Sequence, residues 1–246
     1  MLMFEDAIEK ISESIRPVHS ITRRYKNDEI TPSSATLLFV NDEGYAITTK
    51  TFIDALILSA QTEKRYRAFR EKQMELKQDR RYEKKLQALE EEFDLKQDTM
   101  IQVRSIFLDC VDSLSGYTCH KHPRYNLAIL KFNDFKSLKY ENHAILAKYS
   151  SSVRPGKFLC RIGFPFAEFS NFQYNAEEDT IEWTKDGKPT SPRFPIEGMI
   201  TRFLGDQNGK FGIEMSTPCI SGEGGGPLFD ERGIVYGLQF GTKRMD

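Results

Sequence analysis

The chain has 246 residues, of which 39% are hydrophobic and 29% are charged, and its formal net charge is −1. A chain of this size can fill the core of one large domain or of two small ones. The balanced charge gives no general attraction to nucleic acid, and no apolar run reaches the roughly 18 residues of a spanning helix. We therefore expect a globular protein that neither spans a membrane nor binds nucleic acid.

Residues 1–32 are expected to form an N-terminal helix and a lead-in. Phe4, Ile8, Ile11 and Ile15 recur at helical spacing, which predicts a short amphipathic helix. The same stretch is acidic and has no long apolar core, so it does not resemble a secretory signal peptide. The four cysteines have no framework-like spacing, which favours reduced thiols and a cytoplasmic location.

From residue 33 the chain alternates or runs apolar, which indicates β-strands, and a helical segment interrupts this pattern at about residues 59–98. We call this segment the insertion. The turn sequence at residues 41–44, Asn-Asp-Glu-Gly, separates two strand-like runs and predicts a hairpin. Residues 61–98 then carry 11 basic and 10 acidic residues and no glycine or proline. As one helix they would span about 57 Å, so we expect part of the insertion to project or to fold back.

One narrow stripe of the insertion is apolar. Tyr82, Leu86, Leu89 and Phe93 lie at helical spacing, and we expect them to pack on another helix, in this chain or in a partner. The second case would let the insertion form an oligomer. The basic residues at 80–85 are soon followed by acidic residues at 90–92, which disfavours contact with nucleic acid.

From residue 99 onward the chain consists of short strand-like runs separated by turn sequences, which indicates an antiparallel barrel or sandwich. The sequence around Trp183 predicts a hairpin whose turn is at residues 185–188.

Residues 222–228 read Gly-Glu-Gly-Gly-Gly-Pro-Leu. Glycine serves where backbone takes a positive φ or approaches a ligand closely. A phosphate-binding loop would need a following helix, but here a turn and another strand follow. The run instead resembles the Gly-Asp/Asn-Ser-Gly-Gly-Pro-Leu nucleophile loop of trypsin-like serine peptidases.

Four other blocks in the same order resemble the HtrA-type branch of that family, and together they cover about residues 33–241. They are residues 44–51 (Gly-Tyr-Ala-Ile-Thr-Thr-Lys-Thr), 126–131 (Asn-Leu-Ala-Ile-Leu-Lys), the block from Gly156 to Pro165, and 198–200 (Gly-Met-Ile). The resemblance implies an all-β fold of two antiparallel six-stranded β-barrels. The first would cover residues 33–135, including the helical insertion that lies outside the family pattern, and the second residues 143–246.

The chemistry of the family does not carry over. Its peptidases need a hydroxyl nucleophile, an imidazole base and an orienting carboxylate, and the matching positions here are Gly224, Thr51 and Asn126. The resemblance therefore implies a catalytically inactive homologue that binds a protein or a peptide and regulates or holds it, without a metal or another cofactor.

Some readings stay open. The backbone amides of Gly222 and Gly224 match the oxyanion donors of the family, or these glycines only hold a tight turn. Pro218 matches the base of the specificity pocket, and Gln239, Phe240 and Gly241 match the strand that pairs with substrate, so a bound peptide would present a neutral or apolar side chain.

The alternative function is an active serine-type or cysteine-type hydrolase with a rearranged site that uses Ser221, Cys219 or His122. The residues Cys110, Cys119, His120 and His122 lack the spacing of a tight zinc site, so we expect no metal there.

Overall fold

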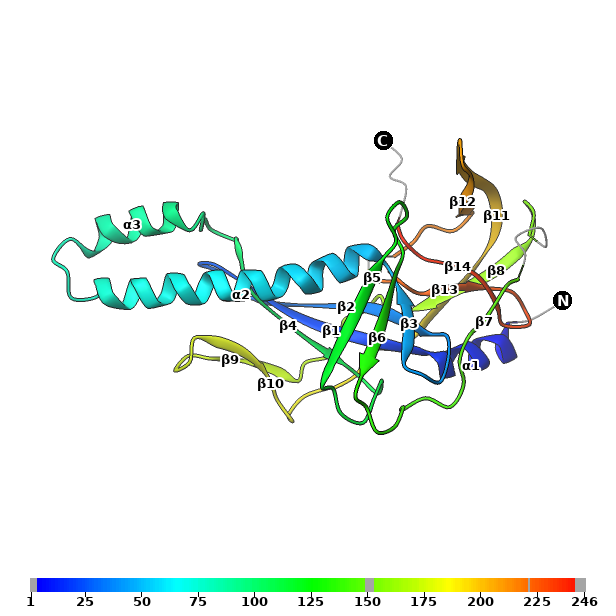
Figure 1. Ribbon diagram of the computed structural model, residues 1–246, viewed down its shortest axis with the longest axis horizontal. Helices are drawn as coiled ribbons and strands as arrows, with labels where there is room; N and C mark the ends of the chain where they lie inside the picture. Colours follow the sequence, from blue (N-terminus) through cyan, green and yellow to red (C-terminus); the bar gives the residue numbers. More distant parts are fainter. Residues whose placement is uncertain (1–3, 149–152, 221, 242–246) are drawn as a thin grey trace.

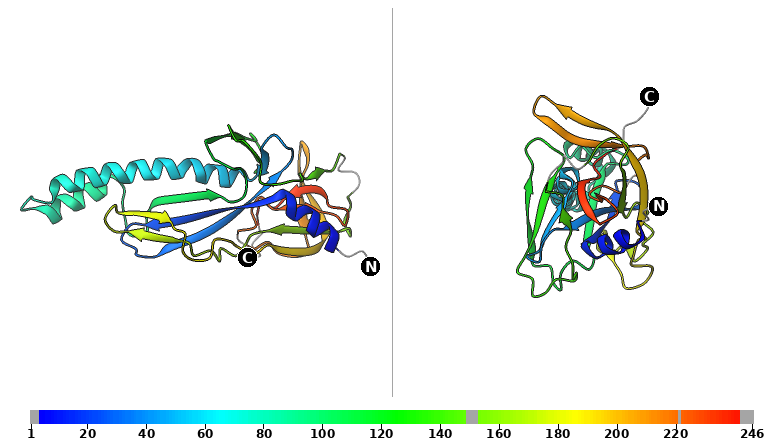
Figure 2. Two further views of the ribbon diagram at one scale, coloured as in Figure 1. Left: turned by 90° about the horizontal axis from the view of Figure 1, so that it is seen from below. Right: turned by 90° about the vertical axis from the view of Figure 1, so that its right-hand side faces the viewer.

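The computed structural model describes residues 4–148, 153–220 and 222–241. These residues form two six-stranded sheets, one two-stranded ribbon and three helices (Figure 1). The molecule is elongated, with a helical hairpin projecting at one end and the second sheet lying toward the other (Figures 1 and 2). The expected all-β architecture of two curled six-stranded units is confirmed.

The first sheet has the strand order β4-β1-β2-β3-β6-β5, and all neighbours are antiparallel. Its core is apolar, with Leu37, Phe39, Leu130 and Phe132 fully buried. Its strands are β1 (Ile15–Arg24), β2 (Ile30–Phe39), β3 (Tyr45–Thr48), β4 (Met100–Phe107), β5 (Gly116–Lys121) and β6 (Ala128–Asn133).

Strand β1 lies in the segment that the sequence predicted to be a helix and a lead-in, residues 1–32. Residues 15–24 do not run alongside the first barrel but form one of its central strands, paired with β2 on one side and β4 on the other. The helical spacing of Ile8 and Ile11 continues to Ile15, but Ile15 is the first residue of the strand and is buried there, as are Val18 and Ile21 further along it.

The second sheet has the order β12-β11-β8-β13-β14-β7. Its pairings are antiparallel except for the short parallel contact between β14 and β7. Leu159, Ile200 and Leu228 fill its core. Its strands are β7 (Ile145–Leu146), β8 (Phe158–Gly163), β11 (Phe194–Asp206), β12 (Gly209–Met215), β13 (Pro227–Phe229) and β14 (Ile234–Leu238).

Helix α1 (Glu5–Ser14) closes the contact between the two sheets. Phe4, Ala7 and Ile11 share one buried cluster with Leu38 of the first sheet and Phe229 of the second. Burial of this apolar face, at about 25 cal/mol per Å², is what attaches the helix. The two barrels therefore share a core at the place where the candidate site lies.

The insertion is a helical hairpin of α2 (Lys50–Leu76) and α3 (Tyr82–Glu92) (Figure 1). It folds back on itself, one of the two arrangements expected. However, α2 begins nine residues before the predicted start at 59, because Thr49 caps the helix by accepting a hydrogen bond from the Phe52 amide.

The apolar stripe of α3 is used within the chain. Leu89 is buried against Tyr66 and Phe69 of α2, and Leu86 and Phe93 pack on the same cluster. The hydroxyl of Tyr82 accepts a hydrogen bond from Gln73 of α2. These four residues thus join the two helices of the hairpin, so the helix on which the stripe packs belongs to the same chain.

Asp179 anchors the hairpin to the β-structure. It lies between β9 (Phe172–Asn175) and β10 (Thr180–Trp183), which form the two-stranded ribbon. Its carboxylate contacts Arg23 of β1 at 2.7 Å and Arg70 of α2 at 2.6 Å, and it accepts hydrogen bonds from Tyr66 and Tyr174.

The ribbon is the hairpin expected around Trp183, but its turn lies at residues 176–179 and not at 185–188.

Candidate functional site

The site begins where β3 meets α2. Strand β3 ends at Thr48, whose buried hydroxyl donates to the Thr36 carbonyl at 3.0 Å. Thr49 caps α2, so Thr51 lies in the first helical turn and its side chain is exposed. The hydroxyl-rich sequence at residues 48–51 therefore serves a strand end and a helix cap.

Asn126 connects the two barrels. Its Oδ1 accepts hydrogen bonds from the Thr51 amide at 2.9 Å and from the Thr51 hydroxyl at 3.1 Å. Its Nδ2 donates to the Phe240 carbonyl at 3.3 Å. The partners on one side are donors and the partner on the other is an acceptor, which fixes the orientation of the amide. A carboxylate could not donate to Phe240, so asparagine suits a bridging role.

Three glycines of the loop are required by the packing of its backbone. A Cβ on Gly225 would lie 2.1 Å from the Thr36 carbonyl oxygen, and one on Gly226 would lie 2.3 Å from the Ile162 carbonyl oxygen. Gly222 and Gly225 have φ of +96° and +86°, which disfavours any other residue. The backbone of both barrels therefore holds this loop in place.

Gly224 differs from its neighbours. A Cβ placed there would have Thr49 Oγ1 as its nearest neighbour, at 3.9 Å, and Gly224 has no positive φ that demands glycine. The loop therefore has room for a side chain at this position. Gly224 lacks a nucleophile although the backbone could carry one, whereas close packing or a positive φ requires glycine at positions 222, 225 and 226.

The amides of Gly222 and Gly224 are the donors expected for an oxyanion. Glu223, Gly225 and Gly226 donate their amides to the carbonyls of Ile220, Gln239 and Glu223, respectively. Across residues 4–148, 153–220 and 222–241, neither Gly222 nor Gly224 donates to a backbone carbonyl, and both are partly exposed. Two amides at this position can bind a carbonyl or carboxylate oxygen.

A buried ion pair lies behind the loop. Glu223 Oε2 is 3.4 Å from Arg161 Nε, and their side chains are only 1% and 3% exposed. Arg161 also donates to the Thr217 and Pro218 carbonyls, and Glu223 accepts from the Ile220 amide. Burial raises the pKa of Glu223. The hydrogen bond from the Ile220 amide and the charge of Arg161 act against this rise.

The sequence analysis did not single out this pair. A signal was present in the sequence, because each partner is a lone charge in an otherwise apolar or glycine-rich run.

A groove of 830 Å³ lies between the barrels beside Asn126. Its lining is mostly apolar and includes Phe211 of β12, Leu238 of β14 and Phe240. Arg124 and Asp206 also line it, and their charged atoms lie 3.5 Å apart. Volume and lining suit an extended apolar or neutral segment.

Of the four residues predicted to contact a peptide, Phe240 lines the groove and the other three make contacts elsewhere. Gln239 uses its amide and carbonyl to pair with Gly226 and Gly225. Gly241 accepts a hydrogen bond from the Gln239 side chain. Pro218 is exposed, does not line the groove, and accepts a hydrogen bond from Arg161.

Two of the three alternative catalytic residues, Cys219 and His122, lie in the described part of the chain. Ser221 lies outside the described residues. The Cys219 thiol contacts the Ile220 carbonyl at 3.4 Å. Nδ1 of His122 accepts the amides of Arg124 and Tyr125 and so serves a turn.

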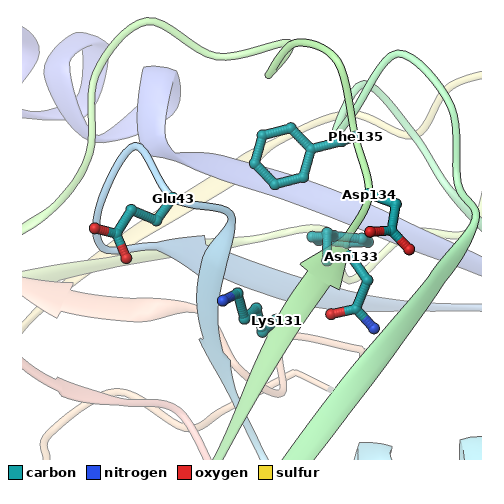
Figure 3. A pocket seen from close by; sticks show the side chains of 6 residues that line it. Glu43, Lys131, Asn133, Asp134 and Phe135 are labelled. Atoms are coloured by element: carbon teal, nitrogen blue, oxygen red, sulfur yellow. The ribbon is translucent and has the colours of Figure 1, made fainter.

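A second hollow, of 550 Å³, lies between the turn after β2 and the end of β6 (Figure 3). It includes Glu43, Lys131 and Asp134, and the two carboxylates point away from one another (Figure 3). Among the described residues, no three His, Cys, Asp or Glu side chains gather in a way that could hold a metal ion. No helix in those same parts of the chain is long and apolar enough to cross a membrane.

Comparisons with known proteins give the fold. No family model and no curated protein sequence matches the chain. Among solved structures, the chain is similar to Deg5, at 14% identity and a TM-score of 0.52, with 97% of this chain and 84% of Deg5 covered.

It also matches the HtrA-type protease AlgW with tripeptide, at 14% identity and a TM-score of 0.48, and a variant of AlgW at 0.49. The chain spans about half the length of the AlgW chains, 53% in each case. The likeness to Deg5 shows a trypsin-like fold.

Proposed function

We propose that the protein is a trypsin-like peptidase homologue without peptidase activity that binds an extended protein segment in the groove between its barrels. The observation that supports this most directly is the bridge from Thr51 through Asn126 to Phe240. Thr51 and Asn126 match the base and the carboxylate of the active peptidases that the sequence resembles. A threonine hydroxyl does not accept a proton near neutral pH, and Asn126 has no base to orient.

The vacancy at Gly224 supports the same conclusion. The loop has room for a side chain there, yet glycine supplies no nucleophile. Restoring serine alone would place a hydroxyl near Thr49 with no imidazole to take its proton. We therefore expect Gly224→Ser to remain inactive, and peptide hydrolysis by that variant would contradict the proposal.

The binding mode we propose is strand addition along residues 238–240. Gln239 directs its backbone groups toward Gly225 and Gly226. Successive residues of an extended chain alternate, so Leu238 and Phe240 direct theirs the other way. The Phe240 carbonyl already accepts a hydrogen bond from Asn126, so a peptide would pair with the other backbone groups on this side. Both residues line the groove. A peptide paired there would place apolar side chains against Phe211 and Phe240, as the sequence led us to expect.

Labelling with activity probes tests the absence of hydrolytic chemistry. The folded protein is treated with a fluorophosphonate and, separately, with iodoacetamide, and the labelled sites are mapped by mass spectrometry. We expect no labelling that depends on the intact fold. Fold-dependent modification of Ser221 or Cys219, together with turnover of a peptide, would establish the alternative of a rearranged hydrolase.

Peptide binding is tested with a library of blocked, uncharged, apolar-rich peptides read by fluorescence anisotropy. Phe240→Ala should weaken the best peptide by at least about tenfold, because a buried aromatic contact typically contributes more than 1 kcal/mol. Phe158→Ala is the matched control, since Phe158 is 56% exposed and does not line the groove. Equal affinities for both variants would contradict the proposed groove.

We also propose a reducing, cytoplasmic environment. The four cysteines all lie in the described part of the chain, where none of them forms a disulfide, and Cys110 and Cys160 are buried, as expected of a protein that does not depend on disulfides. Fractionation of the native cells checks this location.

A further inference from the structure

Helix α3 presents an exposed stripe whose charge changes sign along its length. Arg81, Lys84, Ala88 and Glu91 are all exposed and follow one another at helical spacing, on the side opposite Leu86 and Leu89. The basic residues come first, the small neutral residue lies in the middle, and the acidic residue comes last. Asp94, just past the helix, extends the acidic end.

This order of charges is unfavourable for an isolated helix. The helix dipole favours acidic residues at the N-terminus and basic residues at the C-terminus, whereas the last turn of α3 has no basic residue and contains Glu90, Glu91 and Glu92. Lys85 follows Arg81 at i+4, a spacing at which like charges repel.

Partners within the chain compensate only one side of the helix. Lys85 pairs with Asp79, Lys26 with Glu90, and Lys72 with Glu92. In contrast, the side chains of Arg81, Lys84 and Glu91 make no ion pair within the parts of the chain that the structure describes. Asp94 contacts Lys96 at 3.5 Å, and both of these side chains are exposed.

We propose that this stripe is the contact between two copies of the chain, with the α3 helices side by side and antiparallel. A two-fold axis between Gln87 and Ala88 would place Lys84 of each copy opposite Glu91 of the other, and Arg81 near Asp94. Each surface is then complementary to itself, as a two-fold interface requires, and the opposed helix dipoles attract. This inference rests on α3 alone and is independent of the proposed function.

The arrangement is sterically open. The hairpin projects from the sheets, and α3 stands clear of the second barrel (Figure 1). Ala88, at the centre of the stripe, lets two helices approach closely. The contact is short and mainly ionic, so it should be weak and sensitive to salt, as exposed ion pairs are.

The experiment exchanges the charges of the stripe and measures the association of the chain by sedimentation equilibrium. The full chain should associate to dimers at about 0.05 M salt and dissociate at about 1 M, where charges are screened beyond ~3 Å. The variant R81E/K84E and the variant E91K/D94K should each lose at least about tenfold in association constant. An equimolar mixture of the two should recover it as a heterodimer, because every opposed pair then has unlike charges.

The matched control is K64E/R65E, which makes the same charge change on exposed residues of α2. It should dimerise like the unchanged protein, and circular dichroism checks that every variant is folded. A monomer at low salt and high concentration would overturn the proposal. So would a mixture of folded exchange variants that stays monomeric, or a control that loses association equally.

Discussion

The glycine loop at residues 222–229 and the α2–α3 hairpin are held in place in opposite ways. The loop is fixed through its backbone, because carbonyls of Thr36 and Ile162 lie where any Cβ of Gly225 or Gly226 would be. The hairpin is fixed through side chains, by the cluster around Phe69 and by the carboxylate of Asp179. A loop that is held by its backbone can keep its shape when one of its exposed side chains is replaced. A hairpin that is held by its side chains tolerates substitution only on its exposed face.

The largest expected effect separates required from dispensable glycines within the loop. Gly225→Ala should cost more than about 4 kcal/mol of unfolding free energy, because its Cβ meets the Thr36 carbonyl and its φ is positive. Gly224→Ala should change it by no more than about 1 kcal/mol, since its nearest neighbour is 3.9 Å away. Urea unfolding compares the two, and equal losses would refute this account of the loop.

The ion pair behind the loop gives the next effect. Arg161→Met leaves Glu223 buried without a cation and should cost about 3–5 kcal/mol. Combining it with Glu223→Leu should recover a large part of that loss, because an apolar pair replaces an uncompensated charge. Thermal and urea unfolding of both variants measure the difference. A double variant as unstable as the single one would show that the pair stabilises the fold beyond charge compensation.

His19 belongs to neither region, and it should make the free energy of unfolding depend on pH. Its ring is buried and stacked on Phe169, and burial lowers its pKa from 6.5 to about 4. The unfolded chain therefore binds this proton first as the pH falls. This contribution to stability is complete above pH 6.5 and is lost between pH 6.5 and about 4, by roughly 3 kcal/mol.

His19→Phe should flatten the unfolding free energy across this range. If His19→Phe retains the full slope, other groups cause it.

The smallest effect tests the anchor of the hairpin. Asp179→Asn removes the charge that Arg23 and Arg70 contact and should cost about 2 kcal/mol. Hydrogen exchange should speed up in α3 and in the β9–β10 ribbon, but not in the glycine loop. Asp186→Asn, at an exposed site on the segment after β10, is the control. Faster exchange in the loop would mean that the two regions are not independent.

The sequence predicted the two barrels because their motifs report on backbone geometry. The order of the blocks around Gly44, Asn126 and Gly224 was sufficient for the fold. Gly44 itself has a φ of +80° and packs on Phe135, so its position reflects a structural need. The meeting of Thr51 with Asn126 follows from the same order of motifs.

Other features were missed because they depend on contacts between distant segments. Strand β1 could not be separated from α1, because Ile15, Val18 and Ile21 recur every three residues and so continue the helical spacing of Ile8 and Ile11 instead of alternating. The carboxylate of Asp179 connects β1, α2 and the ribbon. No residue near position 179 in the sequence predicts its contacts with Arg23 and Arg70. The groove is likewise built from β12, β14 and the segment before β6, whose juxtaposition is tertiary.

Helix α2 runs without interruption from the first turn, which holds Thr51, to the residues that contact Asp179. It is thus a rigid spacer that sets both the distance and the angle between the interbarrel bridge and the ribbon. One residue added between Thr51 and Tyr66 would rotate everything beyond it by about 100°, turning Tyr66 and Arg70 away from their carboxylate. Seven added residues would nearly restore the facing but displace it by about 10 Å, so the length of this helix is itself part of the architecture.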